Sequence, residues 1–168
     1  MFSQSYGALK TTIVSSIGLG GACKTQVALK YCHRKKEIDN YRGIFWLDAS
    51  LSKTIGNEMR NVAQQLEPEC LLENNNAAVD MVKSTLSDWT DSWLLVFDNL
   101  NNPSKVATIP DFFPESGFGS ILITSRYHGL HELGQHFLQQ EMDEGDGFSL
   151  LLRQQYLEED EVLRKKNH

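Results

Sequence analysis

The stretch that decides the fold is Gly18-Leu19-Gly20-Gly21-Ala22-Cys23-Lys24-Thr25. It departs at one position, Cys23, from the phosphate-binding loop pattern of Gly, any four residues, Gly-Lys-Ser/Thr. The apolar run at residues 12–17 before it predicts a short buried strand, and residues 26–32 after it predict a helix. A strand, loop and helix in this order distinguish a phosphate-binding loop from a glycine-rich turn before an ordinary helix, which is the alternative reading.

The residue types in this loop suit an anionic ligand. Glycines let the backbone turn tightly and approach a phosphate, so that successive N–H groups and the helix N-terminus face the anion. Lys24 would place a positive charge on the outer phosphates, and the Thr25 hydroxyl would be a magnesium ligand. The candidate nucleotide-binding residues are Gly18, Gly20, Gly21, Ala22, Cys23, Lys24, Thr25 and Gln26. We therefore expect this chain to bind a nucleoside triphosphate or diphosphate.

Length and composition are those of one globular domain. The 168 residues are 40% hydrophobic and 23% charged, with a net charge of -6 that argues against a general nucleic-acid surface. The short basic clusters at 34–36 and 164–166 fit helix ends, where they complement the helix dipole. Three cysteines suggest no disulfide framework, and neither a signal peptide nor a membrane-length apolar run is recognised, so we expect a cytoplasmic protein.

Apolar segments alternate between strand and helix character along the rest of the chain. Further strands are predicted at 43–49, 93–98 and 120–125, with a weaker one at 136–142. Helical patterns are predicted at 55–66, after a cap at Ser50 or Ser52 and ended by Pro68, and at 79–89 and 144–165. The last of these has Phe148, Leu151, Leu152 and Tyr156 on its inward face. This alternation predicts an α/β fold, a parallel sheet with helices on both faces.

Two polar side chains follow predicted strands directly. Asp98 ends the most apolar strand, and Arg126 comes just after the strand at 120–125. In parallel sheets ligands bind beyond the carboxyl ends of the strands, so Asp98 would hold magnesium opposite Thr25, and Arg126 would contact the terminal phosphate. Asp98 and Arg126 are therefore the candidate catalytic residues, although Arg126 could also form an ordinary surface salt bridge. The histidines offer no metal-ligand set, and no nucleophile elbow is present.

Four motifs occur in the order seen in one protein family. They are the loop and helix at 18–31, Phe-Trp-Leu-Asp-Ala-Ser at 45–50, Leu-Leu-Val-Phe-Asp-Asn-Leu at 94–100 and Ser-Ile-Leu-Ile-Thr-Ser-Arg at 120–126. Together they resemble the nucleotide-binding subdomain of NB-ARC proteins, signal-transduction P-loop NTPases of the STAND class. The amino-acid sequences of these motifs are most similar to those of fungal NOD-like receptors. The resemblance covers about residues 12–160, which leaves an N-terminal tail at 1–11 and a charged C-terminal tail at 161–168.

The resemblance carries its own expectations. It implies a three-layer P-loop NTPase fold with sheet order 5-1-4-3-2, and it gives Asp98 the Walker B role and Arg126 the role of a sensor arginine. It implies adenine nucleotide and Mg²⁺ at Lys24, Thr25 and Asp98, with ADP holding a resting state and ATP favouring assembly. Its implied partners are the other domains of a receptor or like modules, with a nucleotide-dependent oligomer and neither nucleic acid nor membrane. The helical and winged-helix subdomains of the family are not recognised, so we expect the core fragment of a receptor.

Two departures from the family pattern leave alternatives open. Cys23 replaces a glycine and would crowd a phosphate or strain the backbone, and Asn99 stands where many relatives carry a second acidic residue. We expect slow or absent ATP hydrolysis in a nucleotide-dependent switch. The alternatives are a degenerate scaffold that has lost nucleotide binding and acts as an interaction protein, and a P-loop kinase. The kinase reading is weak because Arg126 alone supplies arginine in residues 117–140.

Overall fold

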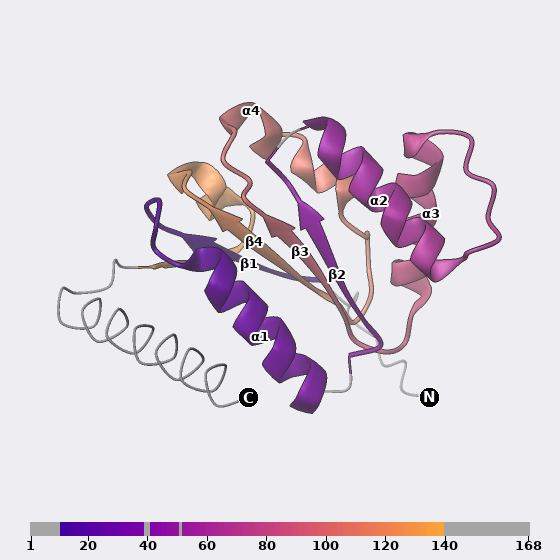
Figure 1. The fold of residues 1–168 in the computed structure, drawn as a ribbon, viewed down its shortest axis with the longest axis horizontal. Helices are drawn as coiled ribbons and strands as arrows, with labels where there is room; N and C mark the ends of the chain where they lie inside the picture. The colour runs from indigo at the N-terminus through magenta and orange to yellow at the C-terminus, as the bar shows by residue number, and fades with distance from the viewer. Residues whose placement is uncertain (1–10, 39–40, 51, 140–168) are drawn as a thin grey trace, which may run out of the picture.

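A computed structural model describes residues 11–38, 41–50 and 52–139 of the chain. Its centre is a five-stranded parallel sheet with the strand order β2-β3-β4-β1-β5, the order that the sequence resemblance implies (Figure 1). The strands are β1 (Thr12–Ile17), β2 (Gly43–Asp48), β3 (Trp93–Asp98), β4 (Ser120–Ser125) and β5 (Gln135–Leu138). The predicted fold class is confirmed.

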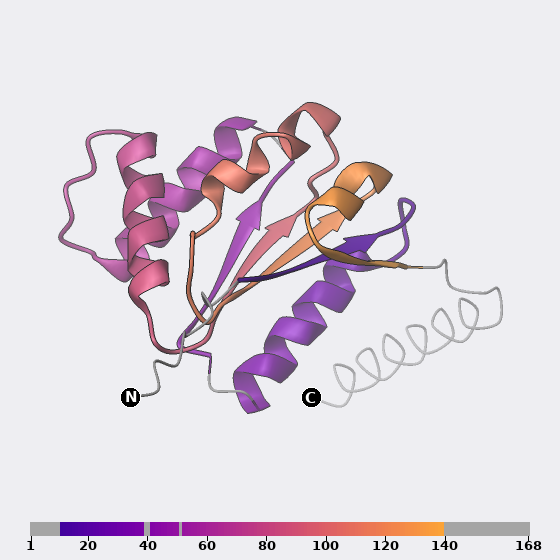
Figure 2. The ribbon, with the colours of Figure 1, turned by 180° about the vertical axis from the view of Figure 1, so that it is seen from behind.

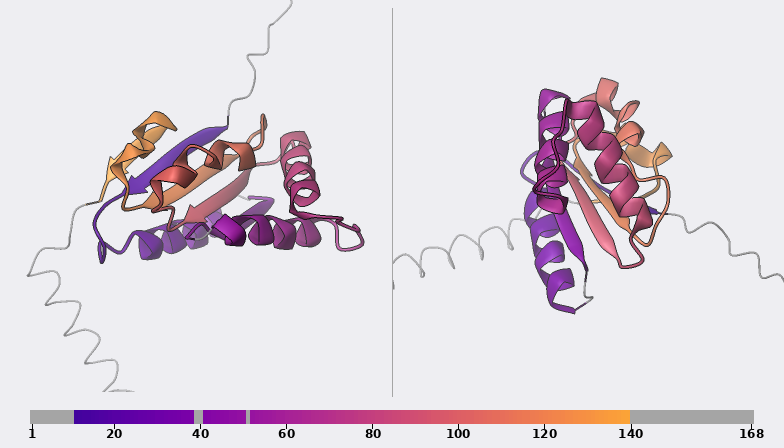
Figure 3. Two further views of the ribbon diagram at one scale, coloured as in Figure 1. Left: turned by 90° about the horizontal axis from the view of Figure 1, so that it is seen from above. Right: turned by 90° about the vertical axis from the view of Figure 1, so that its right-hand side faces the viewer.

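The helices cover the two faces of this sheet unequally. They are α1 (Lys24–Ile38), α2 (Ser52–Leu66), α3 (Asn75–Asp88), the short α4 (Pro103–Val106), and the 3₁₀ helices η1 (Ile109–Phe112) and η2 (His128–Glu132). Figure 3 shows the sheet between α1 on one side and η2 on the other. Figure 2 shows α4 and η2 near the arrowheads of the strands. The candidate residues follow the strands at this same edge: the glycine-rich loop after β1, Asp98 at the end of β3 and Arg126 after β4.

Alternating strand residues build a separate apolar core on each face. The larger core joins α2, α3 and the 3₁₀ helices to the strands, and its strand residues include Leu47, Leu95, Phe97, Ile121 and Ile123. The smaller core lies under α1 and contains Ala28, Cys32, Leu94, Val96 and Leu122. Strand β3 is buried on both faces from Trp93 to Phe97, as its continuously apolar sequence predicts.

Several predicted boundaries need correction. Helix α1 begins two residues earlier than predicted, at Lys24, and continues to Ile38, so the basic cluster at 34–36 does lie in its last turns. The helix predicted at 79–89 begins four residues earlier, at Asn75, because the Asn74 side chain accepts the Ala77 N–H at 2.9 Å and caps the helix. Strand β5 begins one residue earlier than predicted.

Parts of the predicted layout fall outside the described residues. These are residues 140–142 of the predicted fifth strand, the predicted helix at 144–165, and nearly all of both predicted tails. Within the described ranges, no helix is long and apolar enough to cross a membrane.

Candidate functional site

A pocket lies at the carboxyl edge of the sheet, where the parallel strands bring their last residues together. It has a volume of about 420 Å³, which is within the usual size of ligand pockets. Its lining residues are Gly20, Gly21, Cys23, Lys24, Thr25, Gln26, Asn99, Thr124 and Arg126. The structure therefore brings most of the predicted binding residues, together with Arg126, to a single site.

The glycine-rich loop is anchored to the end of β4 and packs closely against Gln139. The Gly18 N–H donates to the carbonyl of Ser125 at the end of β4, at 3.2 Å. A Cβ on Gly18 would lie 2.6 Å from the Gln139 carbonyl oxygen, so only glycine fits at this position. Gly21 has a φ of 85°, which favours glycine. The loop glycines are thus required by close packing and by backbone conformation before any ligand is considered.

Cys23 has a backbone conformation that suits glycine. Its φ is 52°, in the left-handed region that costs a non-glycine residue about 1–2 kcal/mol. The side chain is exposed, and its Sγ lies 3.5 Å from the Gly21 carbonyl oxygen. The departure from the family pattern therefore keeps the backbone shape of the loop while adding a side chain at its rim.

Lys24 is folded back over the loop that it follows. Its Nζ donates to the carbonyl oxygens of Gly18 at 2.8 Å and Leu19 at 2.7 Å. Burial lowers the pKa of Lys24 and the nearby Arg126 lowers it further, whereas Asp98 and Cys23 raise it. A phosphate that bound here would have to compete with the two carbonyls for the ammonium group.

Thr25 and Asp98 meet across 73 positions of sequence. The Thr25 hydroxyl lies 3.0 Å from Asp98 Oδ1 and 3.1 Å from Oδ2. A hydroxyl beside a carboxylate is the kind of all-oxygen donor set that Mg²⁺ uses, so these two residues fit the ion. No group of three or more His, Cys, Asp or Glu side chains suited to a metal occurs within the described part of the chain.

Thr124 is a site residue that the sequence analysis did not single out. Its buried hydroxyl donates to Asp98 Oδ1 and accepts the Asn99 N–H at 3.0 Å. Asn99 has a φ of 68°, in the left-handed region, so the chain turns sharply after β3. The hydrogen bond from the Asn99 N–H to Thr124 stabilises this turn. The available signal in the sequence was a polar residue in the last two positions of an apolar strand, just before Arg126.

Arg126 lies over the phosphate-binding loop. Its backbone N–H donates to the Asn101 side chain at 2.8 Å, which fixes the start of the segment after β4. A Cβ built on Gly20 would lie 3.8 Å from both Cδ and Nη1 of Arg126. The guanidinium group is thus close to the loop glycines and to Lys24, so the site gathers two positive charges near one carboxylate.

Lys105 is a second residue that sequence reasoning missed. It is only 7% exposed, and its Nζ donates to the carbonyl oxygens of Ser50 at 2.8 Å and Ala49 at 3.4 Å. Burial lowers its pKa, while Asp48 raises it. Lys105 therefore ties α4 to the end of β2, and a lysine in a polar stretch carried no signal for this role.

Comparisons with known proteins place the chain among nucleotide-binding signalling proteins. The NB-ARC domain model matches residues 4–158. A nucleotide-binding leucine-rich repeat (NLR)-like protein of Hyaloscypha variabilis is 25% identical over 155 residues, covering 82% of this chain and 16% of that protein. The probable disease resistance RPP8-like protein 4 of Arabidopsis thaliana is 27% identical over 120 residues, covering 70% of this chain and 13% of that protein. The chain thus spans less than a fifth of the length of either relative.

One solved structure supports the fold independently. The crystal structure of Cdc6p from Pyrobaculum aerophilum matches with a TM-score of 0.61 at 13% identity, covering 86% of this chain and 43% of that one. At this identity the likeness concerns the fold alone.

Replacement of Thr124 by valine tests the geometry of the site. The isosteric change removes the hydroxyl that Asp98 and the Asn99 N–H share, and leaving such groups unpaired costs about 1–3 kcal/mol. We expect the free energy of unfolding, measured in urea, to fall by that amount. Thr90→Val, at an exposed position between α3 and β3, is the matched control and should change it by less than about 0.5 kcal/mol. Equal effects of the two changes would contradict the role given to Thr124.

Proposed function

The chain belongs to the NB-ARC family of signalling NTPases, and from this premise we propose that it is an adenine-nucleotide switch module that binds ADP or ATP at the pocket beside Lys24. The observation that carries the proposal is the meeting of the glycine-rich loop, the Thr25–Asp98 pair and Arg126 at one edge of the sheet. A site with clustered N–H donors and two cations matches the charge of a nucleotide's phosphates.

Each side chain has a distinct part in this proposal. Backbone N–H groups of residues 20–26 would bind the inner phosphates, at the N-terminus of α1. Lys24 would leave the carbonyls of Gly18 and Leu19 and bind the outer phosphates. The Thr25 hydroxyl and the Asp98 carboxylate would hold Mg²⁺, which when bound neutralises phosphate charge.

Slow hydrolysis is the second part of the proposal. Asn99 is neutral and cannot take a proton from an attacking water as a carboxylate would. Arg126 would stabilise charge on the terminal phosphate, but it cannot replace a base. Binding that outlasts chemistry suits a switch, whose two nucleotide states must each persist long enough to be recognised.

The proposed partners are inferred from the length of the two relatives, which are much longer than this chain. Because this chain spans less than a fifth of either matched relative, we propose that the module acts beside other receptor domains or like modules in the cytoplasm and assembles in a nucleotide-dependent way. Cys23 supports one alternative, a scaffold of the same fold that no longer binds nucleotide, because its side chain stands at the loop rim with a φ of 52°.

The first test is nucleotide affinity. Lys24→Ala removes the ammonium group, and charge-assisted hydrogen bonds of about 1.5–3 kcal/mol each correspond to at least about a tenfold loss per bond. We expect binding of labelled ADP and ATP, titrated with and without Mg²⁺, to weaken by about 100-fold or more. Lys30→Ala, at an exposed position of α1 outside the pocket, should leave the affinity unchanged. Unchanged affinity in Lys24→Ala would eliminate the proposed site.

Cys23→Gly addresses the substituted loop position. Glycine adopts the observed φ without strain and opens the rim to a phosphate, so we expect stability to rise by about 1 kcal/mol and nucleotide to bind more tightly. Isothermal titration calorimetry and urea unfolding measure the two effects. Cys23→Ala keeps the Cβ and removes only the thiol, so it should recover little of either gain. A glycine variant that binds no better than the parent would show that Cys23 is not the obstacle.

The third test is turnover. We expect ATP hydrolysis by the purified chain to be slower than about 1 per second, well below the median enzyme rate of about 10 per second. Phosphate release is the measurement, and Asp98→Ala is the control for contaminating ATPases. Turnover at or above that rate, abolished in Asp98→Ala, would refute the switch and favour a true enzyme.

A further inference from the structure

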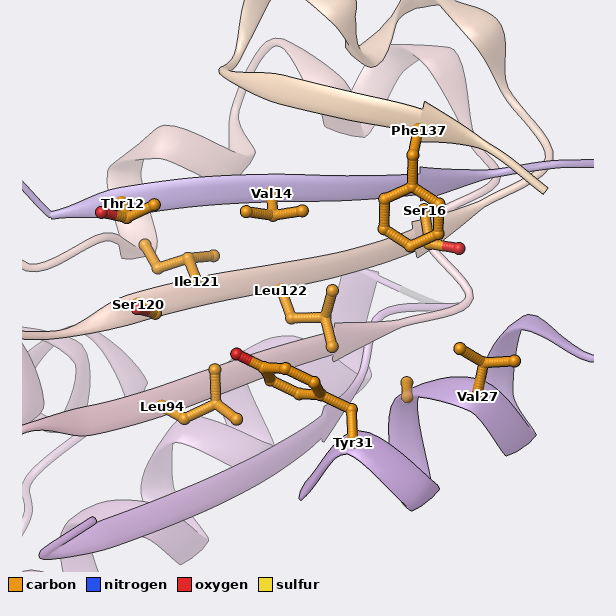
Figure 4. A pocket seen from close by; sticks show the side chains of 11 residues that line it. Thr12, Val14, Ser16, Val27, Tyr31, Leu94, Ser120, Ile121, Leu122 and Phe137 are labelled. Atoms are coloured by element: carbon orange, nitrogen blue, oxygen red, sulfur yellow. The ribbon is translucent and has the colours of Figure 1, made fainter. Parts of the chain in front are cut away.

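The sheet face that carries α1 is only partly covered. Helix α1 packs on β3 and β4, and between it and β5 lies a pocket of about 320 Å³ (Figure 4). Val14 of β1 and Leu122 of β4 lie at its floor, Val27 and Tyr31 approach it from α1, and Phe137 approaches it from β5. The lining is apolar apart from a few hydroxyl groups, which separates this pocket from the charged nucleotide site.

Large apolar side chains are exposed around this pocket and converge on it. Val27 is 44% exposed, Tyr31 40% and Phe137 44%. Single exposed apolar residues are common on protein surfaces, but a group that shares one hollow marks a place where another element packs. All four residues of β5 are exposed, so the described residues leave this end of the sheet less covered than parallel sheets normally are.

We propose that residues 144–165 of the same chain form an amphipathic helix that packs into this pocket. The sequence places Phe148, Leu151, Leu152 and Tyr156 on one face of such a helix. Four large apolar side chains at this spacing require a hydrophobic surface, and the α1 face of the sheet offers one of matching character.

The point where the described chain ends supports this occupant. Phe137 lines the pocket, and two residues later the Gln139 N–H donates to the Ile17 carbonyl at 2.6 Å. The remaining residues, 140–168, therefore start beside the pocket. A helix over residues 144–165 would be about 33 Å long, enough to cross a sheet whose six-residue strands span about 20 Å.

Direction and charge agree with this placement. Helix α1 runs from the carboxyl edge of the sheet to the amino edge, and a helix returning from the end of β5 would run the same way beside it. The later half of α1 carries exposed basic residues, among them Arg34 and Lys36. The later half of the proposed helix carries four consecutive acidic residues at 158–161 and two basic residues, Arg164 and Lys165, so it is net negative. Its net charge is opposite to that of the basic residues of α1, and opposite charges on neighbouring helices attract each other.

The test compares two single substitutions in the full chain. Leu152→Glu places a charge on the apolar face of the proposed helix, and Gln154→Glu places the same charge on the opposite face as a control. Hydrogen exchange of peptides covering residues 148–156 reports their protection, and hydroxyl-radical labelling reports the exposure of Tyr31 and Phe137. We expect Leu152→Glu to lower the protection at least tenfold and to raise the labelling at least twofold, and Gln154→Glu to do neither.

Two further substitutions, made on α1, distinguish a loss of this contact from general misfolding. Val27→Glu changes an exposed wall of the pocket, and His33→Glu changes an exposed position on another side of the same helix. With circular dichroism unchanged in both, only Val27→Glu should lower the protection of residues 148–156.

Three outcomes would overturn the proposal. Residues 148–156 could exchange without protection in the unsubstituted chain. Protection could rise with protein concentration alongside dimers in sedimentation equilibrium, which would show that a second copy covers the pocket. Finally, the labelling of Tyr31 and Phe137 could stay unchanged in Leu152→Glu but rise in Phe2→Ser, a substitution near the N-terminus. That result would show that residues 1–10, and not residues 144–165, cover the pocket.

Discussion

The parallel pairing of β1 with β4 and of β4 with β3 is the constraint on which the candidate site depends. Its register sets Ile17 beside Ser125 and Phe97 beside Ile123, so three strands end at the same edge. The glycine-rich loop, Asp98 and the segment around Arg126 follow these strands directly. A shift of one residue in any pair would turn apolar side chains out of the cores and separate Asp98 from Thr25. Core packing and site geometry are therefore maintained by the same hydrogen-bonded ladder.

At this edge of the sheet, the polar groups of the site form hydrogen bonds with one another. Lys24 donates to loop carbonyls, Thr25 contacts Asp98, and Thr124 joins Asp98 to the turn at Asn99. A ligand that enters this pocket exchanges existing hydrogen bonds for new ones, so the net gain is smaller than the number of its contacts suggests.

The two faces of the sheet differ in how completely they are covered. On the larger core, α2, α3 and the 3₁₀ helices bury residues such as Phe97 and Leu130. On the other face, α1 packs on β3 and β4, and among the described residues Phe137 of β5 remains exposed beside the apolar pocket (Figure 4). This region borders the strand that leads into the phosphate-binding loop, since β1 ends at Ile17 and β5 pairs with it. An element that packs there would contact β1, the strand that leads into the glycine-rich loop.

The sequence by itself determined the strands β1, β3 and β4 and the loop and helix after β1, because each of these is encoded in local periodicity and spacing. Four ordered motifs also indicated the family, by their resemblance to NB-ARC proteins. It also indicated Asp98 and Arg126 as site residues from their positions after strands. Only the tertiary structure decided the role of Thr124, the burial of Lys105 and the close approach of Gln139 to Gly18. These contacts join residues between 25 positions apart (Asn99 and Thr124) and 121 positions apart (Gly18 and Gln139), so the pairing of the strands determines them and the local sequence pattern does not.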